Sequence, residues 1–411
     1  MALKLQDTHQ NFWQLASVTG TALGLPATII AGQLAVQYGP GTALLSVLVG
    51  NFIHWLIGLA IISMTVGRNQ AIENIRGYLG NTTSLVASLV WICAFIIWYS
   101  IQIKWAANTV SLVFPNFNLG ILGGILGITA ALLSRGGILL IKHFCVICLP
   151  LLLFFSIYIA AASPQVVIFQ GTWGISFSAV ITIIAVWLPG IVNLPTFFRH
   201  SRSKADSLIA ISLTVLFHAF FQITSIFAGI SGFSQTLPEV SATPFLLFLF
   251  AIPAYLCCNL LNIYYASAGW ETIHPSHQNT REYLIIGLIG TLAFVLSQGS
   301  LLSFQNSLPM ERIENLLSSF IGSSGIVLLI DFLIRLVVRH RPRPYEKLLS
   351  SLCWLGGCIS SIIVQTYHSA TSNQPLIIGM LTSALLFLVL VFVEETLWSM
   401  KKVSQRHFLS K

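Results

Sequence analysis

The sequence predicts an all-α integral membrane protein of twelve transmembrane helices, arranged as five-plus-five inverted repeats with broken helices 1 and 6. Only 8% of the residues are charged while 55% are hydrophobic, and the mean hydropathy is +0.84, so a water-facing surface could not be kept solvated. Apolar stretches of the roughly 20 residues that cross a bilayer as a helix recur along the chain. Gly and Pro interrupt the first and the sixth stretch at corresponding places.

The apolar stretches are continuous, which favours helices over the alternating segments of about ten residues that form a membrane barrel. The predicted spans cover residues 12 to 36, 41 to 66, 84 to 112, 117 to 134, 140 to 162, 174 to 198, 207 to 231, 243 to 267, 283 to 303, 315 to 338, 348 to 368 and 375 to 398. Residues 1 to 345 then form a ten-helix core with inverted repeats at about 12 to 162 and 174 to 338, and residues 346 to 411 add two helices and a cytoplasmic tail.

Basic residues predict the orientation in the membrane. If the amino terminus is cytoplasmic, the loops after even-numbered helices are cytoplasmic too and should collect Lys and Arg. Of the 20 basic residues, 18 fall on that side, and the exceptions are Arg312 and Lys104. We therefore expect a multi-pass protein of a cell membrane, such as a bacterial inner membrane, with both termini cytoplasmic. The net charge of +8 reflects contact with anionic lipid, and no nucleic-acid partner is expected.

The first and the sixth span each contain a break. "GTALGLP" covers residues 20 to 26, and "WLPGIVNLP" covers residues 187 to 195 with two prolines and a glycine. Unpaired N–H and C=O groups are costly in hydrocarbon, so a break is tolerated beside a protected cavity. Because the two spans are five apart, the paired breaks predict an inverted-repeat transporter fold with its site near the bilayer midplane. A simple proline kink is the alternative for either break taken alone.

The third span contains "WYSIQIKW", which places Trp98 and Gln102 one turn apart on one helix face, with Trp105 at i+7. An indole offers a flat π surface, and an amide offers a donor and an acceptor together. This combination suits a planar, neutral, amide-bearing ring. The alternative is a tryptophan that packs between helices and a glutamine that bonds to a neighbouring helix.

The sixth and the eighth span hold further candidates. Trp187 and Asn193 are six residues apart, and unwinding at the Pro-Gly pair between them would let both side chains face one cavity. In the eighth span, Asn259 and Asn262 are amides at membrane depth that need partners. A ring stacked between two indoles, with its edge bound by Gln102 and an asparagine, would satisfy these groups together.

Four motifs in order resemble one family of carriers. "VLVGN" at residues 47 to 51 is close to the family's "VLIGN", and "WYSIQ" resembles its Trp-x-x-x-Gln. "WLPGIVNLPTFFRHSR" resembles "W......N.PDFTRF", and "GSSGIVLLIDFLIRLVVR" resembles "PPIGGVLIADYFLVRR". The chain thus resembles the nucleobase:cation symporter-1 family of cytosine, purine and allantoin permeases and hydantoin transporters, over spans one to ten. Two positions depart from it, since Thr196 replaces an Asp and "GSSGI" replaces "PPIGG".

The residues themselves and the resemblance together give a set of candidate site residues. The substrate-binding candidates are Gly24, Trp98, Gln102, Trp187, Asn193, Asn259 and Asn262. The ion-coupling candidates are Gly20, Leu23, Cys257, Cys258 and Lys104. Lys104 is included because a charge within the membrane is costly to keep there, although its side chain could extend to the interface. His54 and His218 also lie within spans, and histidine titrates in the range that a proton-coupled carrier would use.

The resulting prediction is a monomeric secondary transporter that imports a nucleobase or a related planar heterocycle. It is coupled to H⁺ or Na⁺, or acts as a facilitator, because no GxxxxGK[ST] motif for ATP is found. An amino-acid or amine carrier of the same fold remains the alternative. An intramembrane enzyme would need a cluster such as HExxH, so no enzyme is expected.

The seven cysteines all lie in predicted spans, where cysteine acts as a small apolar residue. Cys145 and Cys148 form a CxxC pair beside His143, but no second pair of metal ligands is in view. We expect no cofactor and no bound metal apart from a transported cation.

The cysteines of the eighth span generate a prediction about sodium. The family places hydroxyl residues there, whereas the closest match in this chain is Cys257 and Cys258. A hard cation prefers oxygen to sulfur, so uptake should change by less than about twofold when external sodium is replaced by choline. A steep dependence of the initial uptake rate on sodium would contradict this prediction.

Overall fold

The computed structural model describes residues 9–64, 71–162, 172–228, 243–274, 280–297, 310–337, 346–367 and 374–409. All regular structure in this part is α-helical. The helices are α1 (Phe12–Ala22), α2 (Gly24–Tyr38), α3 (Pro40–Met64), α4 (Ala71–Ser111), α5 (Leu119–Ser134), α6 (Gly137–Ala162), α7 (Phe177–Val192), α8 (Leu194–Phe198), α9 (Lys204–Ala228), α10 (Thr243–Ile273), α11 (Thr280–Ser297), α12 (Met310–Val337), α13 (Glu346–Tyr367) and α14 (Gln374–Leu409).

Each predicted span contains one helix or one pair of helices. Nine helices of the described residues are long and apolar enough to cross a membrane, and α1 with α2 forms a tenth crossing as a bent pair. The ten do not include α11 or the 16-residue α5, so the count of twelve stays a prediction. The orientation also stays a prediction, and several basic residues behind it lie outside the described residues, namely Lys4, Arg68, Arg339, Arg341, Arg343 and Lys411.

The break in the first span falls at Leu23, inside the predicted interval. Leu23 has φ −103° and ψ 4°, and the axes of α1 and α2 differ by 49°. The Leu23 N–H donates to Thr21 O instead of closing the next helical turn on Thr19 O. The carbonyl of Thr19 is therefore released from the main-chain ladder and needs another donor.

The break in the sixth span falls at Asn193, which has φ −94° and ψ 1°. The predicted unwinding at Pro189 and Gly190 is wrong, because both residues lie inside α7. Pro195 gives the physical reason. It has no N–H to donate into α7, whereas it fits the first turn of the new helix α8, where an N–H has no partner in any case. The bend between α7 and α8 is smaller than the bend in the first span, because the two helices together form one continuous apolar span, Phe177–Phe198.

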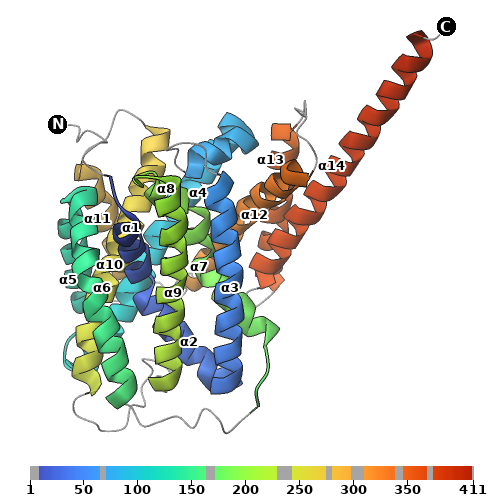
Figure 1. Cartoon of the computed structure of the whole chain (residues 1–411). Coiled ribbons are helices and arrows are strands. Elements are labelled where there is room, and N and C mark those ends of the chain that lie inside the picture. Colours follow the sequence, from blue (N-terminus) through green and yellow to red (C-terminus); the bar gives the residue numbers. More distant parts are fainter. Residues whose placement is uncertain are drawn as a thin grey trace.

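The broken spans lie in one bundle with α3 and α9 (Figure 1). α3 packs on α7 and α9, while α9 packs on α1 and α2. The scaffold around this bundle contains α10 against α4 and α6, and α11 against α5. α1 begins and α14 ends at the same end of the molecule in Figure 1.

The last two helices pack closely against each other and against α12. A Cβ on Gly357 of α13 would lie 2.6 Å from Gly379 O of α14, so the two backbones meet there. A Cβ on Gly322 of α12 would lie 2.8 Å from Leu376 Cδ1 of α14. The domain boundary predicted at residue 345 lies outside the described residues.

The contact at Gly357 predicts a stability effect. Gly357→Ala should lower the free energy of unfolding by about 1 to 3 kcal/mol, because backbone atoms cannot move aside for the new methyl group. Thermal unfolding of the purified protein measures this loss. Gly124→Ala is the matched control, since the nearest atom to its Cβ is 3.9 Å away. Equal melting temperatures for both variants would show that the two helices do not depend on this contact.

Candidate functional site

A cavity lies where the α1–α2 junction meets α4, α7 and α10, and it contains about 520 Å³ of empty space, its opening included. The structure brings together six of the predicted site residues, namely Leu23, Trp98, Gln102, Trp187, Cys258 and Asn262. Residues from three helices and from the α1–α2 junction, which are distant in sequence, therefore form one concave surface.

Gln102 lies in this cavity wall with its side chain fully buried. Neither its Nε2 nor its Oε1 has a hydrogen-bond partner among the described residues. Buried amide groups in folded proteins are almost always paired, and an unpaired one costs about 1 to 3 kcal/mol. The amide of Gln102 therefore presents an unpaired donor and an unpaired acceptor at the wall of the cavity.

Two indoles border the same space. Trp98 is half-buried and its ring lies 6.0 Å from that of Trp105, edge to face. Trp187 is buried, and its indole lies beside Gly190 of the same helix, where a Cβ would lie 2.9 Å from the indole Cδ1. Glycine at position 190 thus gives the indole room beside the backbone.

The α10 side of the cavity is polar. Asn262 Nδ2 donates to Asn259 Oδ1 over 3.1 Å and to Cys258 Sγ over 3.6 Å. Asn259 Nδ2 in turn donates to Tyr99 O over 3.3 Å. Asn259 therefore orients Asn262 from behind, while Asn262 and Cys258 line the cavity itself.

The other predicted residues do not line the cavity. A Cβ on Gly20 would meet Phe217 of α9, and one on Gly24 would meet Ala254, Leu152 and Phe221. Gly20 thus serves close helix packing, whereas a Cβ on Gly24 would make ordinary van der Waals contacts.

Three side chains point to other partners. Asn193 Oδ1 accepts a hydrogen bond from the Thr196 hydroxyl, and Cys257 contacts the thiols of Cys145 and Cys148 on α6. Lys104 lies on an exposed face of α4. All seven cysteines are free, and Cys93 alone is exposed.

Several residues that line the cavity are not among those predicted from the sequence. Phe95 precedes Trp98 by three positions and Gln102 by seven, so the helical period alone would have placed it on the same face. Tyr265 follows Cys258 by seven positions and could have been found in the same way. Thr19 also lines the cavity, but no sequence signal marks it, because its place depends on the bend at Leu23.

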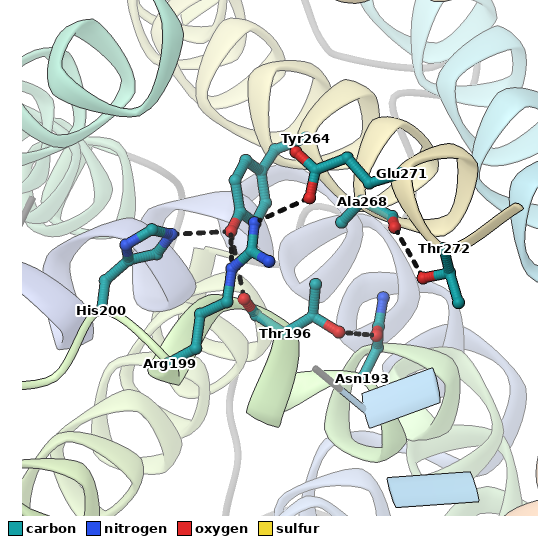
Figure 2. A network of polar contacts seen from close by, with 8 residues as sticks. All are labelled: Asn193, Thr196, Arg199, His200, Tyr264, Ala268, Glu271 and Thr272. Atoms are coloured by element: carbon teal, nitrogen blue, oxygen red, sulfur yellow. Dashed lines mark hydrogen bonds and ion pairs between the residues drawn. The ribbon is translucent and has the colours of Figure 1, made fainter. Parts of the chain in front are cut away.

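A polar network lies beyond the break in the sixth span (Figure 2). The Tyr264 hydroxyl accepts from Arg199 Nε over 3.1 Å and pairs with His200 Nε2 at 2.8 Å, and it donates to Thr196 O over 3.1 Å. Arg199 also forms an ion pair with Glu271 at 3.3 Å. Burial opposes the charge of Arg199, but the Tyr264 hydroxyl and the Glu271 carboxylate outweigh burial and raise the pKa of the guanidinium above its ordinary value.

The segment before α1 joins this network. Gln10 N donates to His200 O over 2.7 Å, and Arg202 N donates to Gln10 O over 3.0 Å. The residues just before the first broken span and just after the second are thus hydrogen-bonded to each other. Together with Tyr264 of α10, these contacts join α8, α10 and the segment before α1 to one another.

No family model and no curated protein matches the chain. By structure, it is similar to Mhp1, a nucleobase-cation-symport-1 family transporter solved in a closed conformation with bromovinylhydantoin bound, with a TM-score of 0.65 at 15% identity over 95% of this chain and 94% of that one. It is also similar to MhsT in complex with L-phenylalanine, with a TM-score of 0.62 at 16% identity over 94% and 98%. A third similar structure is the manganese transporter of Eremococcus coleocola, with a TM-score of 0.59 at 15% identity over 98% and 97%.

These likenesses show the fold. By its similarity to these structures, the chain has the LeuT-type fold. The structure of the chain itself has the predicted breaks, at Leu23 in span one and at Asn193 in span six.

The Tyr264 network generates a test of closure. Tyr264→Phe removes the hydroxyl that joins α8 to α10, and charge-assisted hydrogen bonds contribute about 1.5 to 3 kcal/mol, so opening at this end should become roughly tenfold more frequent. A membrane-impermeant thiol reagent applied from that side should then label Cys258 faster. Cys258→Ser in the same background is the control that identifies the labelled thiol. Unchanged labelling of Cys258 would show that the network does not hold this end closed.

Proposed function

We propose that the chain is a secondary transporter that imports a neutral planar heterocycle of the nucleobase or hydantoin type. The observation that supports this most is the Gln102 amide, which is buried in the cavity wall with its donor and its acceptor both unpaired. A lactam or amidine edge, in which N–H and C=O or C=N groups are adjacent, would pair both atoms at once.

The surrounding residues fit the faces of such a ring. Trp98 and Trp187 border the cavity and offer indole surfaces for stacking, which favours a flat guest over a branched one. Asn262 adds an amide from the opposite helix. No Asp, Glu, Lys or Arg lines this cavity among the described residues, which favours a neutral guest. The hydantoin bound in Mhp1 is a ring of this class.

The fold supports transport by alternating access. The bundle of broken spans with α3 and α9 would move against the scaffold of α4, α5, α10 and α11, so that the cavity opens to one side at a time. The Tyr264 network would close one side, and its release would open it. Movement against a concentration gradient requires coupling to an ion.

A carrier of amino acids or other small carboxylates is the second candidate. The amino-terminal end of α2 has no side-chain cap, and Leu23 and Pro26 at this end line the cavity. Free N–H groups and the helix dipole attract a carboxylate there. The L-phenylalanine bound in MhsT is a ligand of this class.

A thermal-shift screen of the purified protein distinguishes the two candidates. The panel contains cytosine, uracil, purines, allantoin, hydantoins, thiamine precursors and L-amino acids, each with and without sodium. A ligand at about 100 times its Kd stabilises the folded state by about 2.7 kcal/mol, which is readily measured. We expect a shift with a heterocycle, while a shift with amino acids alone would overturn the proposal.

Gln102→Leu should separate binding from stability. The variant should melt at a higher temperature than the wild type without ligand, because an unpaired buried amide costs about 1 to 3 kcal/mol. It should also lose the shift given by the heterocycle. A Gln102→Leu variant that keeps this shift would remove the residue from the site.

Gln33→Leu is the matched control, since Gln33 lies on an exposed face of α2. This substitution should leave the heterocycle shift unchanged. A loss of the shift in this control would mean that the assay reports damage to the fold.

A further inference from the structure

Two histidines pack against Trp187 from different helices. The ring centroid of His218 on α9 lies 4.0 Å from that of Trp187, and the ring centroid of His54 on α3 lies 5.0 Å from it. Both pairs are edge to face, with interplanar angles of 87° and 86°. Both histidines are buried. The indole that borders the cavity is therefore in contact with two imidazoles that lie behind it.

Each histidine also contacts the main chain of a broken span. His218 Nε2 lies 3.2 Å from Thr19 O, the carbonyl that the bend at Leu23 releases from its helical partner. His54 Nε2 lies 3.1 Å from Ile184 O of α7. A carbonyl can only accept, so each Nε2 carries its proton and donates.

The two contacts cross between the repeats. α3 belongs to the first repeat and its histidine binds the broken span of the second repeat, whereas α9 belongs to the second repeat and its histidine binds the broken span of the first. The Nδ1 atoms of both rings are left with no hydrogen-bond partner among the described residues. Each Nδ1 is therefore a free lone pair that can accept a proton.

The helices closest to the two imidazole rings supply no charged side chain. α1, α2, α3, α7 and α8, which pack around the two rings, contain no Asp, Glu, Lys or Arg. The remaining charges on packed helices are Lys204 and Asp206 at the start of α9, Lys142 on α6, and Glu311, Arg312, Glu314, Asp331 and Arg335 on α12. The other titratable groups on these helices are Tyr38, His143, Cys145, Cys148 and Tyr158. His54 and His218 are the two titratable side chains whose rings contact Trp187 in the described part of the chain.

We propose that His54 and His218 form the proton-exchanging site that couples movement of the broken-span bundle to a proton gradient. The proposal rests on the proposed function, in that a secondary transporter needs a coupling ion. A proton from water on one side adds to a free Nδ1 and gives an imidazolium, whose Nε2–H remains bonded to the carbonyl. The same proton leaves to water on the other side, so one proton is bound and one is released for each cycle.

Trp187 links this site to the cavity. A cation that lies over the face of an indole within about 6 Å of its centroid is attracted to the ring, so Trp187 would stabilise an imidazolium that meets its face. The same indole borders the cavity in which the heterocycle would stack. Proton and heterocycle therefore act on one side chain, and the coupling between them must be reciprocal.

The first experiment needs no transported solute. Tryptophan emission of the purified protein is recorded from about pH 8 to about pH 4, the range in which histidine titrates, because an imidazolium quenches an adjacent indole. We expect a transition that is lost in the double variant His54→Gln, His218→Gln and in Trp187→Phe. His143→Gln is the control, since His143 is exposed on α6, and should keep the transition. Asn at positions 54 and 218 serves as a second pair if the Gln variants fail to fold.

The second experiment uses proteoliposomes and radiolabelled cytosine, uracil, hypoxanthine and allantoin. Under an inwardly directed proton gradient, uptake should fall by about tenfold or more in His54→Gln and His218→Gln, within the range of allosteric couplings. Counterflow exchange of the same solute, which needs no proton, should continue in both variants.

The outcomes separate the two proposals. If none of the four solutes is transported by the wild type, the proposed substrate class fails, while the fluorescence titration still decides the proton site. If gradient-driven uptake persists in the double variant, or if its emission titrates as in the wild type, the histidine pair does not exchange the proton.

Discussion

In a bilayer, a main-chain N–H or C=O that leaves its helix has no water to bond to, and the structure depends on how it meets this constraint at two residues. At Leu23 the chain bends by 49° and releases Thr19 O, which His218 then contacts from α9. At Asn193 the change of direction is milder. Pro195, which has no N–H that would need a partner, lies in the first turn of the new helix α8. Each break is thus supported by the residues around it, and the cavity lies between the two.

The cavity combines groups that are satisfied with one that is not. Asn259 and Asn262 bond to each other within α10, and the glycine at position 190 gives Trp187 its room. Gln102 alone among the predicted cavity residues keeps an unpaired donor and acceptor. Natural proteins tolerate a buried polar group without a partner where a ligand can pair with it. The unpaired amide of Gln102 therefore points to a ligand more strongly than the two indoles do, because packing alone would explain the burial of the indoles.

The helices were predicted from hydropathy, and the first break was predicted from Gly and Pro. These signals are strong because a main-chain N–H or C=O without a partner is costly in a membrane. The shared cavity of Trp98, Gln102 and Trp187 was also predicted. The position of the second break was not, since both prolines are candidates and their different consequences depend on the neighbouring turn. Gly20, Gly24 and Cys257 turned out to face other helices, because a sequence gives spacing along one helix but not the helix that faces it. The contacts of His54 and His218 with Trp187 also required the tertiary arrangement.

The pairing of Gln10 with the residues around Ser201 makes a parallel β-bridge between the segment just before the first broken span and the segment just after the second. Such a bridge joins the start of α1 to the end of α8 through main-chain hydrogen bonds. Its strength resides in backbone groups, so side-chain substitutions in these segments would leave it intact.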